Sequence, residues 1–373
     1  MLRPQAKWGA GHGQRVHAAT TAGAHARSHT GKRARGGRLR CERAVWQGAW
    51  DAREDVAEAW DDDDGQAVGS CATGDGSSIA GFPGAELGPS TLDVCSSMVD
   101  IMEPDWEDRA IEVFSSSGFV LVSGVLKLHQ SSAVLHDCKL AERKIVGPKR
   151  AGNRGPGRYS FGKASNTRGM LHLESFSKHL LDSACGKLLP LLDKILGPGF
   201  CCVGCGGDFV VGGTRKDQDL HPDIQVAKEH DVHLPVPLLS VNFTIMPLTE
   251  VNGPMRIIPG AWRRDVKVPS PLPDEWLRSR LCPVPAGTAI VRDVRVLHGG
   301  TANLSADTRF LPSVEFACAA FRAAGRGTCF PPPRCLPKEL YDQLKCTGIR
   351  AACTELVAED GDEFSRPVGY LRK

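Results

Sequence analysis

Two short segments of this chain carry residue types that bind transition metals. The first is His221-Pro222-Asp223, and the second is His298-Gly299-Gly300. Two histidines and one carboxylate, with one pair spaced i, i+2 and the third residue far downstream, are typical of the facial triad of non-haem Fe(II) oxygenases. Three facial ligands leave three positions on the metal, enough for a bidentate 2-oxo acid and O₂. We therefore predict an iron site built from His221, Asp223 and His298.

An arginine follows the second segment at a useful distance. Arg309 comes eleven residues after His298, which allows a loop and a return on a neighbouring antiparallel strand. Its planar guanidinium can hold the distal carboxylate of 2-oxoglutarate through two parallel hydrogen bonds, which a lysine cannot reproduce. With period-2 alternation, Arg309, Leu311, Ser313 and Glu315 are expected to share one face of that strand.

Two further polar residues are candidates for contact with the same co-substrate. The segment 238–246 alternates between apolar and polar residues, which places Asn242 and Thr244 on the inward face of a middle strand. A rival metal-binding motif, His230-Asp231-Val232-His233, lies in a polar stretch before two prolines. We interpret this second motif as a solvated loop.

The predicted elements explain how distant residues reach one metal ion. In a strand, residues i and i+2 point the same way, so His221 and Asp223 face one interior point. Pro222 lacks an N–H group, which favours a strand edge or a strand end. Many short strands follow residue 200, after helices predicted near 105–117, 125–140 and 176–196. This order predicts an all-β core with flanking helices, as in a barrel or jelly roll.

A loop rich in glycine and arginine spans residues 147–169. A basic glycine loop can cradle an anion, although such a loop is more often a flexible connection. Within it, Arg158 and Tyr159 are our candidates for contact with 2-oxoglutarate or with the phosphates of a substrate such as an acyl-CoA.

The composition bounds the class of protein. The 373 residues are 41% apolar and carry a net charge of +3, which argues against a nucleic-acid partner. Residues 1–97 pass from a basic to an acidic to a Gly/Ser-rich stretch and are not expected to fold. This extension is interpreted as disordered, as an organellar transit peptide, as a nucleic-acid-binding tail, or as the result of a start codon placed before Met98 or Met102.

The oxygenase domain is predicted at 98–330, with a C-terminal extension at 331–373 that holds one short helix. No secretory signal and no membrane span are recognised, so the expected location is cytoplasmic, or organellar if a transit peptide is present. The sequence does not fix an oligomeric state.

Fourteen cysteines are scattered through the chain, and without a secretory signal we interpret most as reduced thiols. The cluster Cys201, Cys202 and Cys205 lacks a suitable second pair for zinc.

The chain resembles the phytanoyl-CoA dioxygenase family over roughly residues 105–322. The resemblance is carried by the order of His221-Pro222-Asp223, the segment 252–262 (NGPMRIIPGAW), His298-Gly299-Gly300 and Arg309, and by the segment 109–125. It implies a double-stranded β-helix and Fe(II)/2-oxoglutarate-dependent hydroxylation, with formation of succinate and CO₂, O₂ as co-substrate and ascorbate as an accessory reductant. Carried over by position, it makes His221, Asp223 and His298 the iron ligands and Arg309 the 2-oxoglutarate residue.

Four comparisons with the family pattern matter. Pro222 stands where glutamine is common, and Ala261-Trp262 replaces a Ser-His ending. Asn242 falls where the family often has a bulkier co-substrate contact. An intact Asp223 favours hydroxylation over halogenation, since related halogenases have a small residue there.

The alternatives are a non-catalytic member that binds metal or 2-oxo acid as a sensor or scaffold, and a cupin-like metal enzyme without 2-oxoglutarate. The substrate is expected to be a small molecule or an acyl-CoA.

Overall fold

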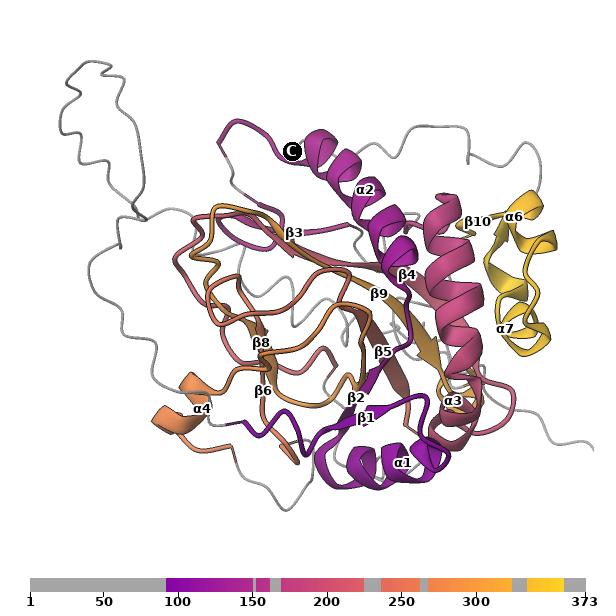
Figure 1. Ribbon diagram of the computed structural model, residues 1–373, viewed down its shortest axis with the longest axis horizontal. Helices are drawn as coiled ribbons and strands as arrows, with labels where there is room; N and C mark the ends of the chain where they lie inside the picture. Colours follow the sequence, from indigo (N-terminus) through magenta and orange to yellow (C-terminus); the bar gives the residue numbers. More distant parts are fainter. Residues whose placement is uncertain are drawn as a thin grey trace, which may run out of the picture. The chain divides into compact units, whose positions relative to one another are not determined.

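The computed structural model describes residues 92–149, 152–161, 169–224, 236–261, 268–323 and 334–358. Figure 1 shows these residues as a β-sheet core with helices packed around it. Within these ranges, no helix combines the length and the apolar character needed to cross a membrane.

The ordered elements begin with a helix between two strands. Strand β1 (Met98–Asp100) pairs in parallel with β2 (Phe119–Ser123), and helix α1 (Trp106–Ser117) connects them. The helix has acids in its first turn, which suits the helix dipole, and it ends at Gly118, whose φ of 82° favours glycine. The helix lies where the sequence predicts it. Residues 1–91 lie outside the described ranges.

One seven-stranded sheet forms the larger wall of the core. Its order is β1-β2-β7-β5-β9-β4-β3, and every pairing except β1–β2 is antiparallel. The strands not yet named are β3 (Arg158–Ser160), β4 (Cys201–Val210), β5 (Leu238–Phe243), β7 (Ala289–Asp293) and β9 (Arg309–Ala317).

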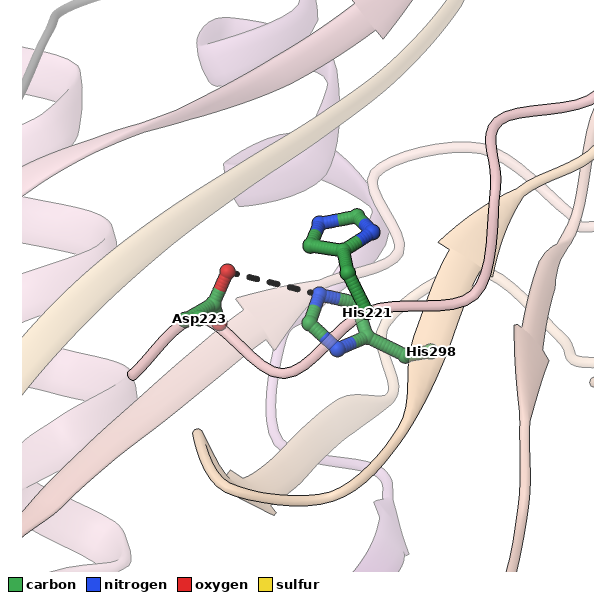
Figure 2. A group of neighbouring side chains, drawn as sticks. All are labelled: His221, Asp223 and His298. Carbon is green, nitrogen blue, oxygen red and sulfur yellow. Dashed lines mark ion pairs between the residues drawn. The ribbon is translucent and has the colours of Figure 1, made fainter. Parts of the chain in front are cut away.

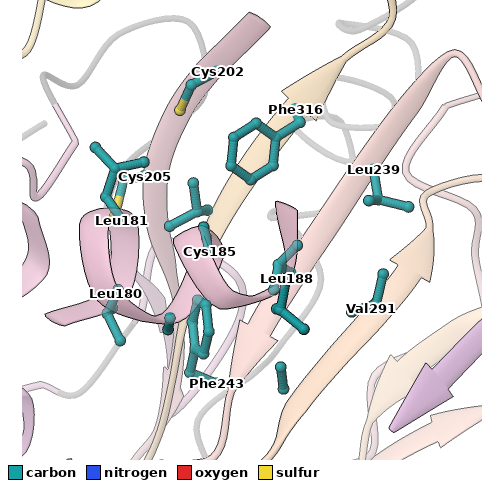
Figure 3. Close-up of a cluster of buried hydrophobic side chains, with 14 of the residues drawn as sticks. Leu180, Leu181, Cys185, Leu188, Cys202, Cys205, Leu239, Phe243, Val291 and Phe316 are labelled. Atoms are coloured by element: carbon teal, nitrogen blue, oxygen red, sulfur yellow. The ribbon is translucent and has the colours of Figure 1, made fainter. Parts of the chain in front are cut away.

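Helices cover one face of this sheet. They are α2 (Leu128–Ile145), the π-helical segment η2 (Phe176–Cys185) and α3 (Leu189–Leu196). Their buried side chains meet those from β4, β5, β7 and β9 in one cluster, part of which Figure 3 shows. The strand residues in this cluster alternate with residues on the opposite face, so burial of the apolar face fixes the register of each strand.

A smaller sheet stands against the other face. Strands β6 (Met255–Ile257) and β8 (His298–Gly300) pair antiparallel, and a bridge joins His221 to His298. Short helix α4 (Asp274–Arg278) packs against β6. The two sheets enclose a cavity, and the predicted double-stranded β-helix with flanking helices is confirmed.

The C-terminal segment differs from the expected extension. It forms β10 (Leu336–Pro337), α6 (Lys338–Asp342), α7 (Thr347–Ala352), η3 (Thr354–Leu356) and β11 (Val357–Ala358), after a short helix α5 (Ala319–Ala323). Ile349, Cys353 and Leu356 are fully buried in the main cluster beneath the helices. Only α6 was expected. The few apolar residues of this segment pack into the main hydrophobic core and form no separate core. Their spacing in the sequence is therefore a weak indicator of secondary structure.

The glycine loop also contains more structure than expected. Residues 158–160 form β3, which pairs with the end of β4 at the edge of the large sheet. Residues 150–151 and 162–168 lie outside the described ranges, as does the rival motif at 230–233. All cysteines in the described part of the chain are free, and most are buried. This agrees with reduced thiols.

Candidate metal centre

Three side chains from two distant segments meet inside the cavity. His221, Asp223 and His298 each offer a ligand atom, and these atoms lie within 4.8 Å of one another. Figure 2 shows the two imidazole rings and the carboxylate turned toward one point, with Asp223 Oδ1 3.5 Å from His298 Nε2. In the described part of the chain, no other group of His, Cys, Asp and Glu side chains meets in this way. The donor set and its spacing fit Fe(II).

The local backbone that presents His221 and Asp223 is irregular. His221 forms reciprocal backbone hydrogen bonds with His298, and the Asp223 N–H donates to the carbonyl of Val294. Over residues 220–224, the strand expected to carry His221 and Asp223 is therefore an irregular segment held by one bridge and one further backbone hydrogen bond. Pro222 lies between them, where no N–H is required, as the sequence predicts for a strand end.

Both histidines keep Nε2 directed at the shared point. Nδ1 of His221 lies 2.7 Å from the carbonyl of Asp219, and Nδ1 of His298 lies 3.0 Å from the carbonyl of Val296. At His221, the backbone carbonyl favours a protonated Nδ1, which leaves Nε2 for a metal. Burial, together with the neighbouring His298, lowers the pKa of His221, which favours the neutral form that binds metal.

Arg292 on β7 contacts the carboxylate of this group. Its Nη2 donates to Asp223 Oδ2 at 2.8 Å, and its Nη1 lies 3.2 Å from His298 Nδ1. Burial alone would raise the pKa of Asp223. The neighbouring His298 and Arg292 have the larger, opposite effect, and the pKa of Asp223 lies well below its usual range. Arg292 thus keeps Asp223 ionised and leaves its Oδ1 toward the shared point.

A pair of buried arginines lies at one end of the cavity. Arg309 is 3% exposed, and its Nε donates to the carbonyl of Gly253, while its Nη1 has no hydrogen-bond partner among the described residues. Arg158 donates to the carbonyls of Lys216 and Thr301. Burial lowers the pKa of Arg309 to about 10, with Arg158 adding to the effect, so Arg309 stays charged at neutral pH. An unpartnered buried guanidinium N–H is a site for an anion.

The close approach of these arginines depends on Gly300. A Cβ at this position would lie 2.5 Å from Arg158 Nη1 and 3.6 Å from Arg309 Nη2. Gly300 is two residues after His298 on β8, a separation of about 7 Å. The arginine pair is therefore within reach of a small dicarboxylate bound at the metal.

The inner face of the large sheet is organised as rows of paired residues. Residues opposite one another on antiparallel strands point to the same face. Successive rows are Arg292–Ser240–Glu315–Gly204 and Ile290–Asn242–Ser313–Gly206, and Arg309–Val210–Arg158 lies at the far end. Arg309, Leu311, Ser313 and Glu315 all line the cavity, as predicted. Asn242 lines it as well, and its Oδ1 accepts from the Ser240 hydroxyl at 3.3 Å.

Two predicted contacts lie elsewhere. Thr244 is fully buried, and its hydroxyl faces the backbone carbonyls of Pro285 and Thr288, so it stabilises the β5–β7 end and does not reach the cavity. Tyr159 borders the cavity, but its ring stacks on Phe209 with centroids 5.0 Å apart, in the core beneath the helices. Adjacent residues of a strand face opposite sides, so Tyr159 points away from the side that Arg158 takes.

Two cavity residues were missed by sequence reasoning. Arg292 is a charged residue within an otherwise apolar strand, and that contrast was an available signal. The role of Gly300 had no such signal, because it depends on where Arg158 arrives from another sheet. Of the departures from the family pattern, Ala261 is buried beside Ile258 and Leu297, and Trp262 lies outside the described ranges.

Comparison with known proteins supplies the class. A model of the phytanoyl-CoA dioxygenase (PhyH) family matches residues 114–311, which include the three metal-binding side chains and Arg309. The chain is therefore a 2-oxoglutarate-dependent oxygenase with a non-haem iron centre. It belongs to the phytanoyl-CoA dioxygenase family.

Solved structures resemble the chain at low sequence identity. HygX from Streptomyces hygroscopicus, with nickel and 2-oxoglutarate bound, is 14% identical, with 56% of this chain and 86% of HygX covered and a TM-score of 0.42. The epimerase SnoN from nogalamycin biosynthesis is 16% identical, with 58% and 82% covered and a TM-score of 0.44. The carbocyclase SnoK from the same biosynthesis is 17% identical, with 56% and 83% covered and a TM-score of 0.40. No curated protein matches the chain.

Proposed function

We propose that this protein hydroxylates a small organic substrate, with Fe(II) held by His221, Asp223 and His298 and 2-oxoglutarate held by Arg309. The observation that carries the proposal is the position of the buried, unpartnered Nη1 of Arg309 at the end of the cavity that holds the three metal-binding side chains. When bound together, Fe(II), 2-oxoglutarate and O₂ supply the oxidising chemistry and yield succinate and CO₂.

The protein's own residues fix the components and shield them from water. Arg309 and Arg158 provide the positive end of the cavity for a carboxylate, and Asn242 provides a polar contact between that end and Ser240. Arg292 holds Asp223 in its ionised form. Apolar side chains such as Leu238, Leu311 and Val294 line the same space and exclude water from the reacting groups.

The intact carboxylate at residue 223 favours hydroxylation within this reaction class. A carboxylate ligand occupies a position on the metal that would otherwise be open to a further small ligand. The acyl-CoA substrate remains a prediction from the basic loop, of which residues 150–151 and 162–168 lie outside the described ranges.

The test is an anaerobic titration of the protein with Fe(II) and 2-oxoglutarate, followed by addition of O₂. We expect a weak visible metal-to-ligand band and succinate formation without added substrate. The His298→Ala variant should lose both signals, because two ligands do not hold the metal firmly. Absence of the band and of succinate from folded, iron-loaded wild type would contradict the proposal and favour a non-catalytic binding role.

A further inference from the structure

The acidic side chains that line the cavity differ in their counter-charges. They are Asp208, Asp223 and Glu315. Asp223 forms an ion pair with Arg292, and Asp208 is close enough to Arg154, Arg158 and Arg309 to raise the pKa of each. Glu315, which is partly buried, forms no ion pair with any described residue. Arg292 is near enough to lower its pKa, but this arginine is already paired with Asp223. The carboxyl group of Glu315 thus has no cation of its own among the described residues.

The surroundings of Glu315 leave one carboxylate oxygen available. The Ser313 hydroxyl donates to Oε1. Oε2 faces Gly204, where an added Cβ would be 3.7 Å away, and no described residue donates a hydrogen bond to it. Its row neighbours are Ser240 and Gly204, and the next row holds Ser313 and Gly206. Small side chains leave space beside a carboxylate at this point.

This space adjoins the metal centre. Ser240 pairs with both Glu315 and Arg292, and Arg292 contacts Asp223. Arg309 is six residues from Glu315 on the same strand, about 20 Å along its axis. The end that receives 2-oxoglutarate is therefore remote from Glu315, and the Glu315 end is left for the substrate.

We propose that Glu315 binds the substrate, and that the substrate carries a protonated nitrogen, such as an amine, which pairs with Oε2. This inference rests on the proposed function, since it takes the arginine end for 2-oxoglutarate. Burial raises the pKa of Glu315 to about 7; the Ser313 hydroxyl and Arg292 lower it, and Asp223 and Asp208 raise it. An ammonium group bound at Oε2 would lower this pKa and favour the carboxylate, because an opposite charge stabilises the ionised form.

An anionic substrate fits this end of the cavity less well. The arginine beside it, Arg292, is engaged with Asp223, while Arg158 already donates to two carbonyls at the other end. A phosphate or carboxylate near Glu315 would meet like charge, and Arg292, the arginine beside it, is already paired with Asp223. The charge pattern therefore selects a cationic group.

The test compares two fragments of equal shape, cyclohexylmethylamine and cyclohexylmethanol. Their binding is measured by ligand-observed NMR on full-length protein loaded anaerobically with Ni(II) and 2-oxoglutarate, so that no turnover occurs. We expect the amine to bind wild type about tenfold more tightly than the alcohol, because hydrogen bonds to a charged partner are roughly twice as strong. Glu315→Gln should abolish this preference. Asp208→Asn should retain it, although it removes the other cavity carboxylate that is not a proposed metal ligand.

Each outcome has a distinct meaning. Equal binding of the two fragments to wild type overturns the inference and needs no variant. A preference that survives in Glu315→Gln also overturns it, because the amine then binds elsewhere. Should Glu315→Gln fail to fold, Glu315→Asp provides the second variant, with a reduced preference expected. Titration of Fe(II) and 2-oxoglutarate into wild type separates failure of this inference from failure of the proposed function.

Discussion

The two ends of the cavity are built on the same strand but by opposite electrostatic means. At the start of β9, Arg309 lies beside a second cation, Arg158, with one guanidinium N–H unpartnered. Six residues later, Glu315 lies beside glycine and serine with no ion-pair partner among the described residues. On the two proposals above, one strand presents an anion-binding end at Arg309 and a cation-binding end at Glu315, on either side of a metal centre.

The largest effect is expected at the anion-binding end. Arg309→Gln should raise the 2-oxoglutarate concentration needed for half-maximal succinate formation by about 100-fold, because a bidentate charged contact is lost. Fe(II) binding should change less than twofold. The measurement is an anaerobic titration monitored by the visible band, alongside the succinate assay.

Arg309→Lys is the matched control, since it keeps the charge but not the planar fork. We expect it to fall between wild type and Arg309→Gln. Unchanged 2-oxoglutarate binding in both variants would remove the distinction between the two ends.

The metal centre between the ends provides the next test. Arg292→Gln should weaken Fe(II) binding by about 10- to 100-fold, the usual cost of losing a side chain that orients a ligand. Arg295→Gln is the control, because Arg295 is also buried but pairs with Asp293 at 2.6 Å and not with a proposed ligand. Equal losses of Fe(II) affinity in the two variants, measured by calorimetry, would show that Arg292 acts only through stability.

A smaller effect is expected from the glycine between the arginines. Gly300→Ala places a Cβ 2.5 Å from Arg158 Nη1 and forces the guanidinium to shift. We expect 2-oxoglutarate to bind about tenfold more weakly, with Fe(II) binding retained, because only the anion-binding end is disturbed. Gly147→Ala, where an added Cβ meets nothing within 4 Å, should have no effect. A loss of Fe(II) rather than 2-oxoglutarate would show that the two regions are not separable.

The mildest test concerns stability at the cation-binding end. Burial raises the pKa of Glu315 from the ordinary 4.5 to about 7, so between these pH values the folded state retains a proton that the unfolded state has released. The free energy of unfolding of wild type should therefore fall as pH rises from about 4.5 to 7 and then level off. Glu315→Gln removes this loss. Its free energy of unfolding should exceed that of wild type by up to about 3 kcal/mol at pH 8 and should equal it at pH 4.

Chemical denaturation at pH 4, 6 and 8 measures this difference. Glu112→Gln, which replaces an exposed acid on α1, should follow the wild-type profile. Parallel profiles for wild type and Glu315→Gln would mean that Glu315 has a counter-charge in solution.

The sequence by itself determined the class of the fold and the members of the metal site. Residue type and spacing were sufficient to predict that His221, Asp223 and His298 meet, because metal binding restricts the ligands to few residue types. Strand alternation also placed Arg309 and Glu315 on one face, since the side-chain period of a strand is two.

The tertiary structure decided which residues meet across the sheets. Arg292 reaches Asp223, and Gly300 makes room for Arg158, only because separate strands pair in one register. Thr244 and Tyr159 fit the sequence pattern, but their side chains have partners away from the cavity. The lack of an ion-pair partner for Glu315 among the described residues likewise depends on its neighbours from other strands. Such contacts join residues far apart in the chain, so no local pattern encodes them.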